Sequence, residues 1–553
     1  MTPGRPLLAG LLAALAATAA TAELTPSQKR GKEIYIRGTT SDGAEITALM
    51  GEDRIEVPAT ALPCVNCHGY DGRGKPEGGV TPTEVTWEAL TRPYEVETPT
   101  GRQYPPYDRR TVKRAITLGI DPAGNDLHIA MPRYHMAHAD LEALVDYLEV
   151  LSADRDLGVG EREVKIGLLL PPAAGPMAPL GVTIRTVIER WAAEVDEKGG
   201  IYGRELRLAA MELPADPAAR AAAVERFLEA EQVFALAAPF FAGADEELAA
   251  LAAARGVPTI GPFTLAATEG FPVNRQVFHL WSGIAGQARA LARWAGRDGG
   301  GPDGAGVQAG AAVQAGGRAG TGAHPEAPQA TAGPPAAVIV EPGDGRLADA
   351  AEAIAEELEQ AGQPPPERLA LAGPTDPAAL AARLRDAGIA DLYLLDTGPA
   401  GLELVAGAAP AGWRPRVLVP GSLAGGALLA AARDLGTPLV LAYPTLPADR
   451  SDRALEELAR LTTGLAPGQD TAAVTALAAA HLLAEGLQRA GRDLSREKLI
   501  TALEGLYDHP TELTPDLTYG PNRRVGARGA YIVTVDPVSG QVRSSGEWVA
   551  VDR

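Results

Sequence analysis

The pattern of apolar and polar residues changes near residue 160 of the chain. Before this point, one face of a predicted helix over residues 140–151 carries Leu141, Leu144, Val145, Leu148 and Leu151. A second predicted helix is marked by Val112, Ile116 and Leu118 and ends before Gly119. Each of these helices is expected to bury one face.

Beyond residue 163, continuous apolar runs alternate with amphipathic segments. The first run, residues 164–171, ends in proline and is typical of a strand buried on both faces. The helix predicted over residues 182–198 carries Ile184, Val187, Ile188, Trp191 and Val195 on one side. Further strands are predicted at residues 205–212, 233–239, 257–262, 336–342, 369–373, 390–396, 416–421 and 438–444, and further helices at 217–231, 245–255, 347–361 and 377–387. This alternation predicts parallel sheets with right-handed crossovers.

One segment interrupts the second part of the chain. Residues 296–335 are rich in Gly, Ala, Pro and Gln and contain almost no large apolar side chain. Such a composition buries too little surface to offset the entropy of ordering, so we predict a disordered insertion. The linker between the two parts is expected to be short, residues 153–162.

The first 22 residues predict export. Arg5 provides a minimal positive region, Leu7 to Ala17 is apolar, and Ala20-Thr21-Ala22 is a cleavage signal of small residues. The alternative, a retained anchor helix, is disfavoured because the apolar stretch is shorter than the roughly 20 residues that a span needs. We therefore expect a cleaved signal peptide over residues 1–22 and a periplasmic protein.

Composition limits the partners. The formal net charge is -20, and removal of Arg5 with the signal peptide takes it to -20 - 1 = -21. Such an acidic chain argues against nucleic acid or anionic lipid as a partner. No later segment is long and apolar enough to predict a membrane span in the mature protein.

The two cysteines of the chain, Cys64 and Cys67, are three positions apart and His68 follows. A disulfide between them would close too short a loop to stabilise much, and a zinc site would need more soft ligands than His68 nearby. A redox dithiol normally opens a helix after a strand, and no strand is predicted before Cys64. The pattern Cys-x-x-Cys-His accounts for all three residues as the attachment site of one covalent haem c.

A second axial ligand for the iron is expected farther along the chain. Residues 119–138 offer His128, Met131, His135, Met136 and His138. Pro132 prevents a helix from continuing and holds the preceding residue extended, which suits a loop that presses one side chain against a haem face. This singles out Met131, and we expect the other four to be packing or surface residues.

Residues 24–152 resemble a class I cytochrome c domain, which is all-α. The resemblance rests on residues 25–39 as the first helix, "CVNCHG" as the haem site, "AMPRY" as the distal loop and residues 140–151 as the last helix. It implies that residues 23–152 form this domain, with His68 as the proximal and Met131 as the distal iron ligand. With both axial positions filled, the implied function is electron transfer and not catalysis.

Residues 163–543 resemble the branched-chain amino-acid type of periplasmic binding protein (type I, Leu/Ile/Val-binding), a fold of two α/β lobes. The stretches that carry this resemblance are residues 164–208, 234–268, 278–295 and 517–536. The whole chain is thus expected to be multidomain, with residues 544–553 as a C-terminal tail.

The second resemblance implies a ligand held between the lobes by loops at the carboxyl ends of strands. The candidate ligand-binding residues are Phe241, Ala242, Thr264, Trp281, Thr397, Ser422 and Tyr443. Amino-acid binders of the family place small hydroxyl residues where this chain has Phe240, Phe241 and Ala242, so we predict weak binding of simple amino acids. Phe240, Phe241, Phe263 and Trp281 would either line an apolar pocket or pack within a lobe.

No arrangement of residues suggests acid–base or covalent catalysis, because His279, His324, His481 and His509 are scattered. We therefore predict a non-enzymatic electron-transfer protein. Its binding domain would recognise a small molecule or dock a periplasmic redox partner such as a dehydrogenase or another cytochrome. The alternative is a solute-binding component of an ABC-type uptake or sensing system with an accessory haem domain.

Overall fold

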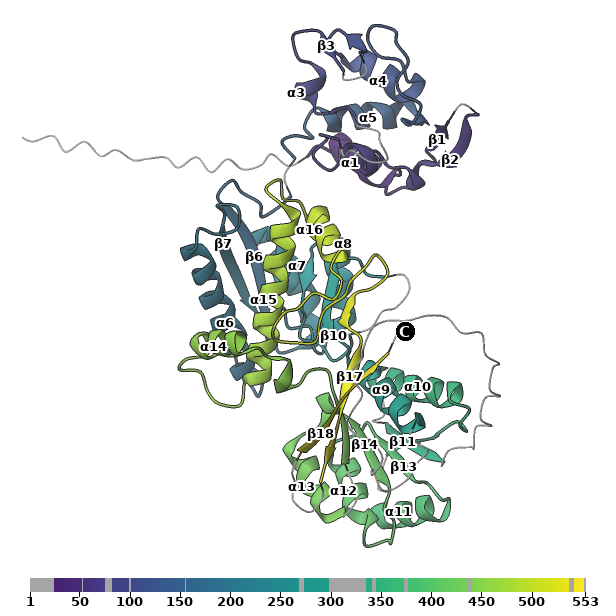
Figure 1. The fold of residues 1–553 in the computed structure, drawn as a ribbon, viewed down its shortest axis with the longest axis vertical. Coiled ribbons are helices and arrows are strands. Elements are labelled where there is room, and N and C mark those ends of the chain that lie inside the picture. Colours follow the sequence, from purple (N-terminus) through teal and green to yellow (C-terminus); the bar gives the residue numbers. More distant parts are fainter. Residues whose placement is uncertain are drawn as a thin grey trace, which may run out of the picture. The chain divides into compact units, whose positions relative to one another are not determined.

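The computed structural model describes residues 24–51, 53–74, 82–98, 101–154, 156–267, 273–297, 335–340, 345–371, 376–435, 439–536 and 542–551. The expected signal peptide lies outside these residues, and so does the expected insertion except at its ends, where residues 296–297 complete a helix. The chain splits into two compact units, Met1–Asp156 and Leu157–Arg553, which are described separately (Figure 1). No helix of the described residues has the length and apolar character to cross a membrane.

The N-terminal unit is built on helices. They are α1 (Pro26–Arg37), α2 (Cys64–His68), α3 (Trp87–Leu90), α4 (Arg109–Leu118) and α5 (His138–Leu148). The two helices predicted from periodicity are confirmed as α4 and α5, although Leu118 is 60% exposed. Helix α1 crosses α5 at Gly31, where an added Cβ would lie 2.0 Å from the carbonyl oxygen of Ala143. Only glycine permits this backbone approach.

Two small antiparallel sheets accompany the helices. Strands β2 (Ile55–Pro58), β1 (Thr47–Met50) and β5 (Arg133–His135) pair in that order, and β3 (Val96–Glu97) pairs with β4 (Gln103–Tyr104). The expectation that no strand precedes Cys64 is therefore wrong. Strand β2 is short and largely exposed, so it has no apolar alternation by which a sequence pattern could be recognised.

The C-terminal unit contains two sheets, each of which defines a lobe. Lobe 1 has the strand order β16-β10-β9-β8-β6-β7, and all of its pairings are parallel. Its strands are β6 (Glu163–Leu170), β7 (Glu205–Glu212), β8 (Ala235–Ala237), β9 (Thr259–Ile260), β10 (Val277–Trp281) and β16 (Val525–Ala527). Its helices are α6 (Ala178–Glu197), α7 (Arg220–Glu231), α8 (Asp245–Ala254), α14 (Asp452–Leu461), α15 (Asp470–Ala490) and α16 (Arg496–Glu504). The predicted parallel sheet is confirmed.

Lobe 2 has the strand order β12-β11-β13-β14-β15-β17-β18. Its strands are β11 (Ala336–Val340), β12 (Glu367–Ala370), β13 (Asp391–Leu394), β14 (Arg416–Pro420), β15 (Leu439–Tyr443), β17 (Gly529–Val535) and β18 (Val542–Ala550). Its helices are α9 (Ile284–Arg297), α10 (Gly345–Gln360), α11 (Pro377–Asp386), α12 (Pro399–Ala408) and α13 (Gly426–Leu435). The pairings up to β15 are parallel, and β17 and β18 add an antiparallel edge that the sequence pattern did not predict.

The end of the chain is part of lobe 2. Residues 544–553 were expected to form a tail, but β18 pairs with β17, and Val549 and Val551 are buried. The ring of Trp548 also packs edge-on against Tyr531, with 4.9 Å between the ring centroids. The apolar contacts of these side chains hold the last strand on the sheet.

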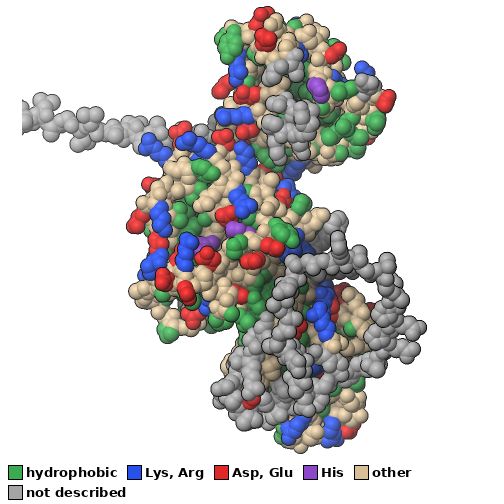
Figure 2. All heavy atoms as spheres, in the orientation of Figure 1, with side chains coloured by type: hydrophobic (Ala, Val, Ile, Leu, Met, Phe, Trp, Pro, Cys, Tyr) green, Lys and Arg blue, Asp and Glu red, His purple; other side chains and the backbone are tan. Residues whose placement is uncertain are grey.

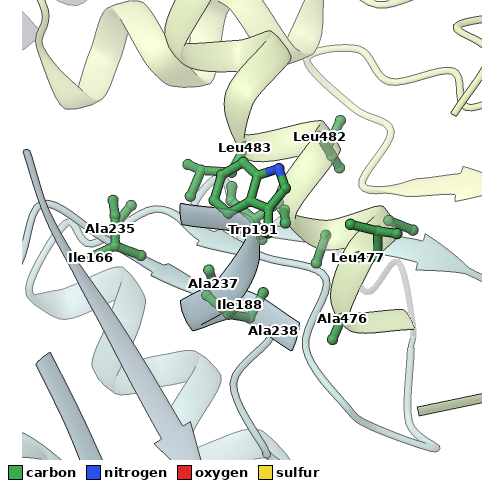
Figure 3. Close-up of a cluster of buried hydrophobic side chains, with 14 of the residues drawn as sticks. Ile166, Ile188, Trp191, Ala235, Ala237, Ala238, Ala476, Leu477, Leu482 and Leu483 are labelled. Atoms are coloured by element: carbon green, nitrogen blue, oxygen red, sulfur yellow. The ribbon is translucent and has the colours of Figure 1, made fainter. Parts of the chain in front are cut away.

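The core of lobe 1 brings together two distant parts of the sequence. Figure 3 shows Trp191 of α6 beside Leu483 of α15, and both belong to one buried cluster with strands β6 and β8. Helix α15 is buried along most of its length. Residues 470–490 are therefore as much a part of lobe 1 as the strands that precede lobe 2 in the sequence.

Three segments connect the lobes: residues 282–283 between β10 and α9, residue 528 between β16 and β17, and residues 444–451 between β15 and α14. Hydrogen bonds of Ser282 join the first two. Ser282 is buried between β10 and α9; its N–H donates to the carbonyl of Ala527 (3.2 Å), and its Oγ accepts from the N–H of Gly529 (3.2 Å). In the third segment, Asp449 accepts a hydrogen bond from the hydroxyl of Tyr531 at 2.6 Å. The strand ends near these crossovers are thus fixed to one another.

Candidate haem centre and ligand loops

Helix α2 presents the two thiols. Pro63 precedes the helix in an extended conformation, and Gly69 ends it with a φ of 74°. Val65 is buried and anchors the turn, while Cys64 is half-buried and Cys67 is exposed. Both thiols are free of a disulfide, and burial raises the pKa of Cys64 to about 12. One turn of helix therefore offers two separate sulfur atoms at the edge of the domain.

His68 is held in one tautomer. Its Nδ1 lies 2.9 Å from the carbonyl oxygen of Thr83, so Nδ1 carries the proton and Nε2 keeps its lone pair. Burial lowers the pKa of His68, which favours the neutral imidazole. A neutral imidazole oriented by a backbone carbonyl is the form that binds a metal ion. Thr83 could not be predicted from the sequence because the hydrogen bond to His68 is made by its main-chain carbonyl and not by its side chain.

Two tyrosines hold the segment around α2. The hydroxyl of Tyr35 on α1 donates to the carbonyl of Gly69 at 2.7 Å, and that of Tyr134 on β5 donates to the carbonyl of Leu62 at 2.6 Å. Burial raises the pKa of both phenols, so they remain neutral donors. The haem-attachment turn is therefore tied at one end to α1 and at the other to the strand that follows Met131.

Met131 is half-buried and begins a fixed segment. Its N–H donates to the carbonyl of His128 at 3.0 Å, and the next residue, Pro132, is buried. Strand β5 starts immediately afterwards and pairs with β1, with Leu49 opposite Arg133. Of the other four candidates, Met136 packs partly buried against the core, and His128, His135 and His138 are exposed. Of the five candidates, Met131 is the one whose place is fixed by a buried proline and by a paired strand that follow it directly.

The side chain of Arg133 braces the same loop. Its guanidinium donates to the carbonyls of Met131 and Leu127, the latter at 3.0 Å. It also lies against Gly119, where an added Cβ would meet its Nε at 1.7 Å. The N–H of Leu127 donates to the carbonyl of Gly119 at 2.7 Å. Arg133 thus bonds to the loop at residues 127 and 131 and packs against its start at Gly119.

The residues fit a haem c. Two thiols one turn apart, a neutral imidazole next to the second thiol and a thioether on a separately anchored loop are the donors that such a group needs. Half-buried apolar side chains accompany them in the same domain core, among them Leu62, Trp87 and Leu127. These side chains supply the apolar surroundings that a porphyrin requires.

The ligand loops of lobe 1 meet at one edge of its sheet, because β6, β8 and β9 are adjacent and parallel. Phe240 and Phe241 are 6% and 2% exposed and belong to a core cluster of this lobe. These two rings therefore pack within the lobe. Phe263 and Trp281 are half-buried and pack against the larger core of the same lobe.

The polar groups of these loops bind one another. The N–H groups of Phe241 and Ala242 donate to the carbonyl of Phe263 at 3.0 and 3.1 Å. The hydroxyl of Thr264 donates to the carboxylate of Asp245 and accepts from the N–H of Ala266 at 2.9 Å. Asp245 therefore accepts the hydrogen bond that the Thr264 hydroxyl was expected to donate to a ligand. Asp245 was not predicted from the sequence.

The candidates of lobe 2 lie at the ends of β13, β14 and β15, which are adjacent in the sheet. Ser422 is exposed and pairs with buried Gln287, whose Nε2 donates to its Oγ at 2.7 Å and whose Oε1 accepts from its N–H at 3.1 Å. Tyr443 is half-buried, and burial raises its pKa. Its ring lies close to Gly421, so Ser422 and Tyr443 are neighbours, while half-buried Thr397 follows β13.

The scattered histidines of the C-terminal unit lie in different environments. His481 on α15 is 3.2 Å from Glu457, and His509 is half-buried. His279 lies on strand β10, and burial lowers its pKa to about 4. His324 is outside the described residues. The described three lie on separate segments and form no common site.

Charged side chains are mixed over the surface. Figure 2 shows acidic and basic residues interspersed on the visible face of both units. Many are paired, as in the contacts of Arg109 with Asp146 (2.6 Å) and Glu149 (2.7 Å). On this face the negative charge of the chain is not gathered in one patch.

Two family models match the chain. One described as periplasmic binding protein matches residues 163–541, and one described as cytochrome c matches residues 59–152. Comparison with curated proteins gives no match.

Solved structures share the fold of the larger unit. A fatty acid ABC transporter substrate-binding protein from Thermomonospora curvata has 19% identity and a TM-score of 0.51, over 72% of this chain and 95% of that one. A branched-chain amino acid ABC transporter protein from Thermus thermophilus with bound valine has 16% identity and a TM-score of 0.53, over 71% and 98%. An ABC transporter solute-binding protein from R. palustris in complex with benzoate has 16% identity and a TM-score of 0.50, over 70% and 98%. At these identities the likeness concerns the fold.

Proposed function

Because the chain belongs to the periplasmic binding protein family and also carries a cytochrome c domain, we propose that it is a periplasmic c-type cytochrome for electron transfer with a fused solute-binding domain. The observation that carries this proposal is the fixed tautomer of His68, whose Nδ1 donates to Thr83 and whose Nε2 is left free directly after the two thiols. This arrangement suits an iron ligand in a covalently attached haem.

In this proposal the residues hold one haem c as follows. Cys64 and Cys67 would hold the haem through thioether bonds from their sulfurs, and Nε2 of His68 and the sulfur of Met131 would bind its iron. When bound, the haem supplies an iron that accepts and releases one electron. The chain itself keeps His68 neutral, orients it through Thr83 and holds the loop of Met131 through Arg133 and β5. Because His68 and Met131 would together leave the iron no position for a substrate, the chemistry supplied would be electron transfer.

Export and partner choice complete the proposal. The signal peptide over residues 1–22 directs the chain to the periplasm, where a redox partner such as a dehydrogenase or another cytochrome exchanges electrons with it. The binding domain recognises a small molecule or docks that partner. The solved structures of this fold differ in their ligands, valine in one and benzoate in another, so the fold alone does not assign the solute.

A second function is supported by the coverage of the solved structures. The chain matches nearly the whole length of substrate- or solute-binding proteins from ABC transporters, 95% and 98% in two cases. A solute-binding component of an uptake or sensing system, with the haem domain as an accessory, therefore remains the alternative proposal.

One experiment separates the two. Native mass spectrometry of protein taken from its own periplasm identifies the haem and any retained solute together, and the midpoint potential is then measured with and without that solute. The electron-transfer proposal expects solute binding to change the potential or the rate of electron exchange. A solute that binds tightly and leaves both quantities unchanged supports the uptake alternative. A protein without covalent haem contradicts the first proposal.

A further inference from the structure

We propose that Asp245 is a specificity-determining residue that excludes carboxylate-bearing solutes from lobe 1, so that the domain admits uncharged apolar molecules. This inference rests on the proposed solute-binding function. Asp245 is the first residue of α8, directly after the loop that follows β8. Since β8 and β9 are parallel neighbours, this loop and the loop after β9 share one edge of the sheet. Ligands of open α/β sheets bind at that edge.

The carboxylate of Asp245 is held by both loops. Its Oδ2 accepts from the N–H of Gly243 at 3.0 Å, and its Oδ1 accepts from the hydroxyl of Thr264. Gly243 has a φ of 89°, a conformation that favours glycine. One donor from each loop thus binds the carboxylate of Asp245, where it would otherwise be available to the carboxylate of a ligand.

The other donors of the first loop are also used within the protein. Phe240 donates to the carbonyl of Leu169 at 2.8 Å, Phe241 and Ala242 donate to that of Phe263, and Ala244 donates to that of Phe241 at 2.9 Å. Every N–H from residue 240 to 244 therefore already has an acceptor. A carboxylate that leaves water needs donors to replace its hydration, and this loop has none left to offer.

The charges at this edge act in the same direction. Asp245 is followed by Glu246 and Glu247, so the first turn of α8 carries three acidic residues that offset the positive end of the helix dipole. The cation against this loop is Arg220, which donates through Nη1 to the carbonyl of Ala242 at 2.7 Å and through Nε to that of Pro214 at 3.1 Å. Its bonds go to the protein main chain, and a second carboxylate beside Asp245 would be repelled.

Apolar surface is available at the same edge. Phe263 follows β9, and Trp281 is the last residue of β10, the neighbouring parallel strand. Both rings are half-buried against the core of lobe 1. These two rings lie beside a loop whose N–H groups are already bonded to the protein, which suits a solute that is apolar and uncharged.

The test uses the full-length, haem-loaded protein and pairs of probes that differ in charge but hardly in shape. Benzoate is compared with benzamide, and valine with valinamide, by calorimetry and thermal shift at neutral pH. The wild type is expected to bind benzamide at least tenfold more tightly than benzoate. Asp245→Ala is expected to gain at least tenfold in affinity for benzoate or valine, or to bind them where the wild type does not.

Glu246→Ala is the matched control, because it removes the same charge from the next residue of the helix, which is exposed, and it should change the ratio much less than Asp245→Ala does. If Asp245→Ala does not fold, Asp245→Asn and Thr264→Val disturb the same contact more mildly. Micromolar binding of benzoate or valine by the wild type overturns the inference, as does an unchanged ratio in the Asp245 variants. If no probe binds any variant, both the inference about Asp245 and the proposed solute-binding function are contradicted. An intact haem spectrum in the same samples would still support the electron-transfer proposal.

Discussion

The haem-binding unit and lobe 1 of the binding domain use their hydrogen bonds in opposite ways. Around α2, the carbonyl of Thr83 and the hydroxyl of Tyr35 support the segment from outside and leave the thiols and Nε2 of His68 uncommitted. In lobe 1, the donors of the ligand loop are bonded to the protein, including its own Asp245. The difference shows that the position of a loop in a fold does not say what it binds until its donors are accounted for.

The largest expected effect tests whether the uncommitted thiols hold haem. Denatured wild-type protein should keep its haem absorbance through acid acetone extraction, and Cys64→Ala/Cys67→Ala should lose all of it because no thioether can form. The single variant Cys67→Ala should keep a weakened attachment through Cys64. Complete extraction of haem from the wild type would contradict the assignment of the two thiols as the haem-attachment groups.

The next effect concerns the distal ligand. Met131→Ala should abolish the weak near-infrared sulfur-to-iron charge-transfer band of the oxidised protein and lower its midpoint potential, because a thioether ligand raises the potential. Met136→Ala is the matched control, since Met136 is partly buried against the core five residues later. If the band is lost in the Met136 variant and kept in the Met131 variant, the ligand assignment moves to Met136.

A backbone contact sharpens the comparison by testing how rigid the haem unit is. Gly31→Ala should lower the free energy of unfolding of this unit by about 3 kcal/mol or more, because the new Cβ would lie 2.0 Å from the carbonyl of Ala143. Chemical denaturation followed by haem absorbance measures the change. Arg37→Ala at the exposed end of α1 should be nearly neutral, and equal effects of the two variants would contradict tight crossing of α1 and α5.

The smallest effect concerns the brace on the distal loop. Arg133→Gln should lower the stability of the Met131 loop by about 1.5 kcal/mol, the usual cost of losing a hydrogen bond from a charged group. External imidazole should then displace the distal ligand at roughly tenfold lower concentration. Arg110→Gln, which changes an exposed residue of α4, is a control, and an unchanged imidazole titration in Arg133→Gln would mean that the pairing of β5 with β1 holds the loop alone.

Local chemistry and periodicity could be predicted from the sequence. The haem motif is contiguous, because thioether formation and axial ligation need Cys64, Cys67 and His68 on one turn. Strands such as β6 of lobe 1 and β15 of lobe 2 are continuous apolar runs, and α4 and α5 show one-sided helical spacing. In each case the signal lies within about ten residues of sequence.

Features that depend on distant partners were not predicted. Strand β5 pairs with β1 more than 80 residues earlier, and neither strand exceeds four residues. Helix α15 is rich in alanine and buried on most sides, so it lacks the single apolar stripe that marks a surface helix. The proposed role of Asp245 in excluding carboxylates rests on its contacts with Gly243 and Thr264, and these contacts form only when the fold brings two loops together.

The shared core of α6 and α15 has a consequence for the order in which the chain folds. Lobe 1 cannot complete its core until residues 470–490 have been synthesised, and β16 closes its sheet only at residues 525–527. Lobe 2 must therefore be made before lobe 1 is finished, and contacts this distant in sequence slow folding. The haem unit has its whole core within residues 24–151, so it can mature while most of the chain is still being made.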